Sequence, residues 1–126
     1  MIVLDENLPE DQRLALRAWR IRARQIGLEV GRAGMSDAEI VPLLHTLTRP
    51  TFFTRDRDFL QPWLRHPGYC IVYLDVSQFE AASFIRRVLR HRGLNTTAKR
   101  MGTVIRAGHD RLAVWRHGNE LERLDW

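Results

Sequence analysis

Aspartates stand at the ends of several short apolar runs in this sequence, and one more begins a helical pattern. They are Asp5, Asp56 and Asp75 after the runs, and Asp37 at the helix start. Ligands of open parallel sheets bind outside the carboxyl ends of the strands, so we expect Asp5, Asp37 and Asp56 to share one rim. Converging carboxylates repel one another unless a hard cation such as Mg²⁺ or Mn²⁺ lies among them. Water on such a cation can attack a phosphate, so the pattern favours phosphodiester hydrolysis.

A simpler interpretation of the same acids stands beside this one. Aspartates directly after strands are common turn and cap residues, and a carboxylate at a helix start is favoured by the helix dipole alone. Glu39 fits a capping box better than a ligand set, Asp58 fits the turn after Asp56, and Glu6 can point outward where its strand ends. Spacing alone leaves both interpretations open.

Alternating strands and helices are the elements that must position these acids. The predicted strands are 2–4, 28–30, 51–54 and 69–74, and the predicted helices are 9–26, 36 to just before Pro50, and 77–91. Capping-box patterns at 36–39 and 77–80 mark two of the helix starts. The alternation predicts an α/β fold with a mostly parallel central sheet, right-handed crossovers and both faces covered, a three-layer α/β/α arrangement.

A short β-meander is predicted at the C-terminal end of the chain. Segments 103–107 and 112–116 flank a turn at 108–110, and 120–126 can add a third strand. The length of 126 residues fits one domain. We expect a core over about 1–98 and a C-terminal β extension over about 100–126.

The charge is segregated along the chain. Residues 1–80 hold 10 arginines and 11 acids, whereas residues 81–126 hold 10 basic residues and 4 acids. Because a basic surface attracts a polyanion, RNA is the expected partner, although a solvated helix face explains the same residues. The candidate RNA contacts are Arg55, Arg57, Arg86, Arg87, Arg90, Lys99 and Arg100. A second stripe at helical spacing, whose candidate partners include an acidic protein segment, comprises Arg13, Arg17, Arg20 and Arg24.

The remaining composition excludes several classes of protein. The single cysteine, Cys70, cannot form an intramolecular disulfide and excludes a Cys-rich zinc site. No apolar run approaches the ~20 residues that cross a bilayer. The first residues are acidic where a signal peptide is basic and then apolar. We therefore expect a cytoplasmic protein with no membrane partner.

Three blocks in order carry a resemblance to a known family. They are Met1–Pro9 (MIVLDENLP), Ser36–Ile40 (SDAEI) and Phe53–Phe59 (FTRDRDF). Over residues 1–75 or so, the chain resembles the compact PIN-like proteins, relatives of the VapC-type toxin nucleases. The resemblance implies a Mg²⁺- or Mn²⁺-dependent ribonuclease whose catalytic acids match Asp5, Asp37 and Asp56, with Asp58 close by. It also implies a toxin that forms a homodimer and is inhibited by a small antitoxin protein.

The sequence departs from the full PIN pattern at one acid. Standard PIN domains carry a further Glu on a helix between the first and third acidic positions, and 7–36 supplies no obvious counterpart. Glu6 or Asp58 is the candidate replacement, as a metal ligand or to orient water.

Two alternative functions remain at this stage. A catalytically silent RNA- or protein-binding module would explain the missing Glu. A phosphoacceptor receiver-like signalling domain would use Asp5, Glu6 and Asp56 but needs a lysine at the end of its fifth strand, and Lys99, the only lysine, precedes that strand.

Overall fold

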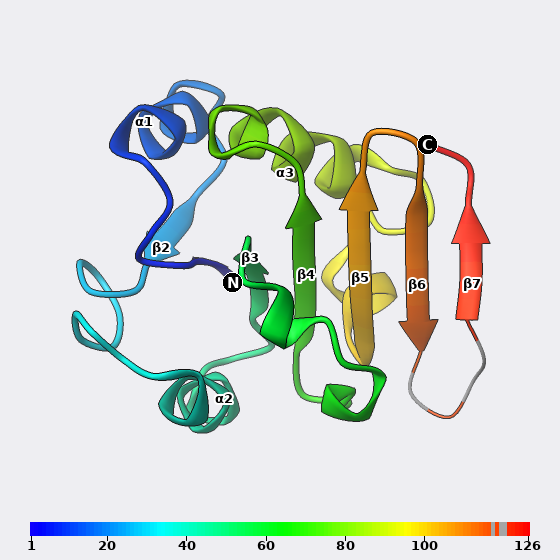
Figure 1. Cartoon of the computed structure of the whole chain (residues 1–126), viewed down its shortest axis with the longest axis horizontal. Helices are drawn as coiled ribbons and strands as arrows, with labels where there is room; N and C mark the ends of the chain where they lie inside the picture. The colour runs from blue at the N-terminus through cyan, green and yellow to red at the C-terminus, as the bar shows by residue number, and fades with distance from the viewer. Residues whose placement is uncertain (117, 119–120) are drawn as a thin grey trace.

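The computed structural model describes residues 1–116, 118 and 121–126 and contains one seven-stranded sheet (Figure 1). Its strands are β1 (Ile2–Leu4), β2 (Ala23–Gln25), β3 (Thr51–Thr54), β4 (Cys70–Asp75), β5 (Thr103–Gly108), β6 (Leu112–Arg116) and β7 (Leu121–Leu124). The helices are α1 (Glu10–Ala18), α2 (Asp37–Thr46), α3 (Ala81–Arg90) and α4 (Thr97–Arg100), with 3₁₀ turns η1 (Arg57–Phe59), η2 (Pro62–Leu64) and η3 (Gln78–Glu80). None of the helices in these residues is long and apolar enough to cross a membrane.

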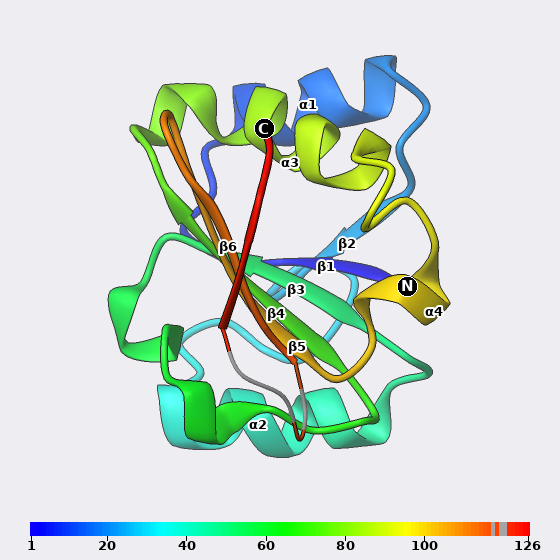
Figure 2. The ribbon, with the colours of Figure 1, turned by 90° about the vertical axis from the view of Figure 1, so that its right-hand side faces the viewer.

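The sheet has the strand order β2-β1-β3-β4-β5-β6-β7. The first five strands are parallel, and β6 and β7 are antiparallel to their neighbours. Helices α1 and α3 lie on one face and α2 on the other (Figure 2). The prediction of an α/β fold with a mostly parallel sheet and a C-terminal meander is confirmed. The first strand of the meander, β5, pairs in parallel with β4, so the parallel part of the sheet extends beyond residue 98.

Adjacent residues of the central strands supply two separate cores. Leu4, Phe53, Val72 and Ile105 pack on the side of α1 and α3, whereas Val3, Phe52, Ile71 and Val104 pack with Ile40 and Leu44 of α2. Successive strand residues point to opposite faces, so a strand that is covered on both sides must be apolar throughout. This requirement explains the uninterrupted apolar runs of the sequence.

The predicted first helix is wrong at its C-terminal end. Helix α1 stops at Ala18 because Arg20 takes a left-handed conformation (φ 61°) and the Ile21 N–H donates to Leu16 O. This arrangement is a Schellman cap, whose left-handed position is usually glycine. The residues that follow form edge strand β2 instead of a longer helix. The predicted strand 28–30 is not formed. Leu28 and Glu29 lie in a turn, where their N–H groups both donate to Gln25 O, and Val30 makes only an isolated parallel bridge with Ile26.

Smaller differences concern the other predicted helix starts and the last strand. The chain makes the 3₁₀ turn η3 after Ser77, whose Oγ accepts from the Phe79 N–H, and Glu80 pairs with His109 rather than completing a capping box. Helix α4 was not predicted. The predicted last strand begins at Glu120, which lies outside the described residues, and β7 covers Leu121–Leu124.

The strand order defines a switch point between β1 and β3. The chain leaves β1 through α1 toward β2 and then returns through α2, on the opposite face, to β3 (Figure 2). At such a point the connections diverge to the two faces and leave a crevice at the carboxyl ends of the two strands. Asp5 follows β1 and Asp56 lies two residues after β3, so both acids stand at this crevice.

Candidate functional site

Three of the predicted acids meet at the switch point. Carboxylate oxygens of Asp37, Asp56 and Asp58 lie within 4.8 Å of one another. Asp37 is the first residue of α2, Asp56 precedes η1, and Asp58 lies within η1. The parallel connection of the strands therefore brings together residues about 20 positions apart in the sequence, and we call these three residues the acidic cluster.

Asp5 is joined to the acidic cluster through Thr54. The buried Thr54 hydroxyl donates to Asp5 Oδ2 at 2.6 Å, and the same hydroxyl oxygen accepts the Asp56 N–H at 2.9 Å. Asp5 itself is 9% exposed, and its Oδ1 accepts from the Asn7 N–H at 3.4 Å. Thr54 thus fixes the side chain of one acid against the backbone of another. It belongs to the Thr-x-Asp-x-Asp-Phe block, but no role was predicted for it from the sequence.

The turn after β3 orients the remaining acids. Asp56 Oδ1 accepts the Asp58 N–H at 2.9 Å and so caps η1. Asp58 was predicted to cap this turn from its position in the sequence; the cap is Asp56. The carboxylate of Asp58 is exposed and shares the cluster with Asp37.

Desolvation and the neighbouring carboxylates raise the pKa of Asp37. Its pKa is raised above the ordinary value of 3.8, first by desolvation, then by the charge of Asp56 and a side-chain hydrogen bond to it, and then by Asp58 and Asp5. Crowded carboxylates favour the protonated form of one member. The charges of the three neighbouring acids therefore act on Asp37.

The donor set fits a hard divalent cation. Within residues 1–116, 118 and 121–126, no arginine, lysine or histidine forms an ion pair with the acidic cluster. Carboxylate oxygens are the ligands that Mg²⁺ and Mn²⁺ prefer, and Mg²⁺ uses only a few of them because it retains water. Asp37, Asp56 and Asp58 would hold such an ion.

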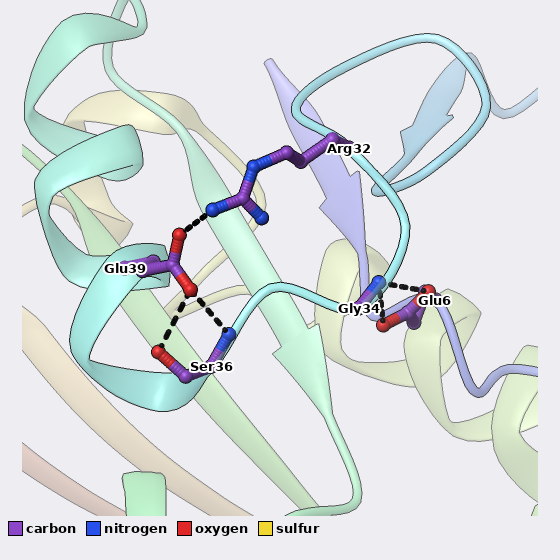
Figure 3. Close-up of polar contacts among 5 residues, drawn as sticks. All are labelled: Glu6, Arg32, Gly34, Ser36 and Glu39. Carbon is purple, nitrogen blue, oxygen red and sulfur yellow. Dashed lines mark hydrogen bonds and ion pairs between the residues drawn. The ribbon is translucent and has the colours of Figure 1, made fainter.

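Glu6 is placed away from the acidic cluster. Its two carboxylate oxygens accept the Gly34 N–H at 2.9 and 3.1 Å (Figure 3). Gly34 has φ 77°, a left-handed conformation that favours glycine. The predicted role of Glu6 as a metal ligand is not supported, because this carboxylate holds the loop that leads into α2. Between the two candidates for the missing helical Glu, the geometry favours Asp58.

The start of α2, which carries Asp37, is held from two sides. Glu39 Oε1 accepts from both the N–H and the hydroxyl of Ser36, at 3.2 and 3.1 Å, while its other oxygen pairs with Arg32 (Figure 3). The capping box predicted at 36–39 is present. Glu6 and Glu39 together position the loop and, with it, Asp37.

Gln25 clamps the loop after β1, a role that was not predicted because the sequence pattern placed this residue in a helix. Its buried Nε2 donates to the carbonyl oxygens of Asp5, Glu6 and Leu8 at 3.0, 3.2 and 3.0 Å. The signal that could have located it is the alternation of arginine with smaller residues over 20–26, which is a strand period.

The predicted basic residues separate into different environments. Arg55 is exposed, its Nε donates to Val76 O at 2.8 Å, and it lines a pocket of about 220 Å³ with Asp5, Asn7, Leu8 and Asp56. Arg57 is exposed on η1 and Arg90 on α3. Arg86 stacks on Trp19 at 3.7 Å and Arg87 on Trp126 at 4.0 Å from the ring centroids.

The remaining two predicted basic residues lie in α4, which precedes β5 at the amino edge of the sheet, opposite the acidic cluster. Arg100 is 5% exposed and donates to Thr51 Oγ1 and Leu94 O, so it supports the core and leaves no face for a phosphate. Lys99 Nζ donates to Arg92 O and Asn95 Oδ1. The predicted RNA contacts therefore do not form one patch. Asp75, the last residue of β4, is paired with Arg106 and takes no part in the acidic cluster.

No family model matches the chain, and comparison with curated proteins and with solved structures found no match.

Proposed function

We propose that this protein is a PIN-like endoribonuclease that depends on Mg²⁺ or Mn²⁺. The observation that carries the proposal is the acidic cluster of Asp37, Asp56 and Asp58 at the β1/β3 switch point, with Asp5 joined to it through Thr54. The resemblance of the three sequence blocks supplies the substrate class. By the same resemblance, we propose a cytoplasmic toxin that forms a homodimer and is paired with a small antitoxin protein.

Each side chain has a distinct task in this proposal. Asp37, Asp56 and Asp58 would hold the cation, which when bound supplies a nucleophilic water and neutralises charge on the scissile phosphate. Asp5 is kept in place by Thr54 and Asn7, and it lines the same pocket as Asp56.

Arg55 is suited to orient the substrate. Its Nε is anchored on Val76 O, so the terminal N–H groups are held beside the pocket that Asp5 and Asp56 line. A guanidinium in this position can donate two parallel hydrogen bonds to a phosphate.

Cleavage of single-stranded RNA with Mn²⁺ tests the proposal. We expect Asp56→Asn to abolish cleavage and to retain the fold by circular dichroism, because the amide can still cap η1 through its oxygen. Asp110→Asn, which changes an exposed acid of the β5–β6 turn, is the matched control and should cleave as the wild type does. Cleavage that survives EDTA or Asp56→Asn would overturn the mechanism. RNA binding without any cleavage would favour the silent module.

The receiver-like alternative has less support from the geometry. The order of the first five strands is one of the two common orders of doubly wound sheets, which such a domain would share. However, Lys99 lies in α4, which precedes β5 at the amino edge of the sheet, and Glu6 binds Gly34. Incubation with acetyl phosphate and Mg²⁺ should therefore leave no adduct on Asp56.

A further inference from the structure

A large groove rich in arginine lies at the amino edge of the sheet, apart from the acidic cluster. Its volume is about 840 Å³, and its floor includes Met1, Ile2 and Ala23, at the starts of β1 and β2. The arginines that line it come from α1, from β2 and from the segment between them, and are Arg13, Arg17, Arg20, Arg22 and Arg24. Although α1 ends before Arg20, the stripe predicted at helical spacing is still gathered on one surface.

Most of these guanidinium groups have no partner in the part of the chain that the structure describes. Among the described residues, no side-chain hydrogen bond or ion pair is formed by Arg17, Arg20, Arg22 or Arg24. Arg13 pairs with Glu10 at 3.5 Å, but its Nε is buried and has no hydrogen-bond partner among the residues that the structure describes. Like charges crowded without counter-charge repel one another, so an anionic ligand would relieve this groove.

The one acid among the described residues that line the groove is already engaged. Glu29 Oε2 accepts the Gln25 N–H at 2.7 Å. The carbonyl oxygen of Gln25 is also occupied, by the N–H groups of Leu28 and Glu29, so both backbone groups of Gln25 on the outer edge of β2 are engaged. An extended peptide binds a sheet edge through free backbone groups of that edge. Gln25 has no free backbone group for such a peptide, which argues against an acidic protein segment that adds to β2 as a further strand.

A further depression has lining residues in common with both the groove and the pocket beside the candidate metal centre. This depression, of about 410 Å³, shares Arg13 with the groove and Leu8 with the pocket beside Asp5 and Asp56. The acids that line it are compensated, since Glu6 accepts from Gly34 and Glu10 pairs with Arg13. β1 separates Met1 from Asp5 by four residue steps, which amounts to about 13 Å. An extended polymer of a few units would span this distance.

We infer that the arginine groove binds backbone phosphates of single-stranded RNA that flank the cleaved bond. The inference rests on the proposed function, which supplies RNA as the polymer. It assigns the contact to a surface other than α3, where Arg86 and Arg87 are stacked on tryptophans. Unpaired guanidinium forks match phosphate oxygens, and each phosphate that is neutralised releases counterions from the RNA.

The test measures binding separately from cleavage. The probe is a fluorescein-labelled 12-nucleotide oligouridylate, titrated by fluorescence anisotropy with the full chain carrying Asp56→Asn, and in parallel with the otherwise wild-type chain in EDTA. The groove variant is Arg17→Gln with Arg24→Gln, both exposed and without partners among the described residues, so the fold should persist. Arg20→Gln with Arg22→Gln samples the same groove if the first pair fails to fold. The control, Arg92→Gln with Arg123→Gln, removes the same charge from positions elsewhere on the chain.

Loss of two phosphate contacts has a calculable signature. Single strands give a salt slope of about −0.7 per contact, so the slope of log K against log salt should be less negative by ~1.4 for the groove variant. At 0.1 M salt this change amounts to roughly 25-fold weaker binding. The control should change affinity by less than about threefold, as expected for loss of distant, screened charge.

Three results would overturn the inference. The first is equal weakening of RNA binding by the groove and control variants, and the second is unchanged RNA binding by the groove variant. The third is that the groove variant loses binding to an oligoglutamate peptide, used as a second probe, but still binds RNA. That result would assign the groove to an acidic protein. If Mn²⁺ supports no cleavage but the groove variant loses RNA, the proposed function fails and the groove assignment stands. If Mn²⁺ supports cleavage but RNA binding does not depend on the groove arginines, the proposed function stands and the groove assignment fails.

Discussion

Replacing Thr54 by valine removes one hydroxyl that serves two acids. In the native protein this oxygen donates to the carboxylate of Asp5 and accepts the N–H of Asp56, and the side chain is 1% exposed. Valine keeps the shape but leaves a buried carboxylate oxygen and a backbone N–H without these bonds. A hydrogen bond to a charged group contributes about 1.5–3 kcal/mol and a neutral one about 0.5–1.5 kcal/mol. We therefore expect Thr54→Val to lower the free energy of unfolding by roughly 2–4 kcal/mol.

Thr54→Ser is the matched control for this prediction. It keeps the hydroxyl and removes one methyl group, which costs about 1 kcal/mol. Urea denaturation of the three proteins in EDTA measures the stability. Mn²⁺ titration of separate samples of the same proteins, after the EDTA has been removed, measures whether Asp5 and Asp56 are still held together. If valine is no more destabilising than serine, the hydroxyl does not bridge the two acids and our account of the site geometry is wrong.

Three further predictions follow from the polar groups of the structure. Because the pKa of Asp37 is raised in the folded state, this group stabilises the fold at pH values below its ordinary pKa of 3.8. That stabilisation is lost as the pH rises through the raised pKa. In EDTA at pH 7, Asp37→Asn should therefore melt at a higher temperature than the wild type, by a small amount because water screens this exposed group. The difference should shrink toward pH 4 in differential scanning calorimetry, and a lower melting temperature at pH 7 would contradict this. Gln25→Met should cost about 2–4 kcal/mol in urea denaturation, since three carbonyl groups lose their donor, and a cost under about 1 kcal/mol would exclude the clamp. Burial raises the pKa of Cys70 to about 11, so its thiol should resist Ellman's reagent at pH 8 until the protein unfolds, and prompt native-state labelling would refute its burial.

The sequence was informative wherever burial required a pattern. The strands at 2–4, 51–54 and 112–116 are read correctly because a sheet covered on both faces needs apolar runs. The convergence of Asp37 with Asp56 also follows from the parallel order, which brings strand ends to one edge.

The local errors arose where tertiary contacts outweigh local pattern. Over residues 20–26, arginines and apolar residues satisfy both a helical and a strand spacing, and the left-handed Arg20 that ends α1 carries no glycine signal. The burial of Arg100 depends on Thr51 of β3 and on Leu94 of the turn before α4. The same is true of Glu6, whose partner Gly34 is 28 residues away.

Calorimetric titration of Mn²⁺ into the metal-free protein tests the central claim most directly. We predict saturable binding heat for the wild type and for Asp110→Asn, and loss of that heat for Asp56→Asn. Equal binding heats for the wild type and Asp56→Asn, or no saturable heat for the wild type, would contradict the assignment of Asp37, Asp56 and Asp58 as a divalent-cation site.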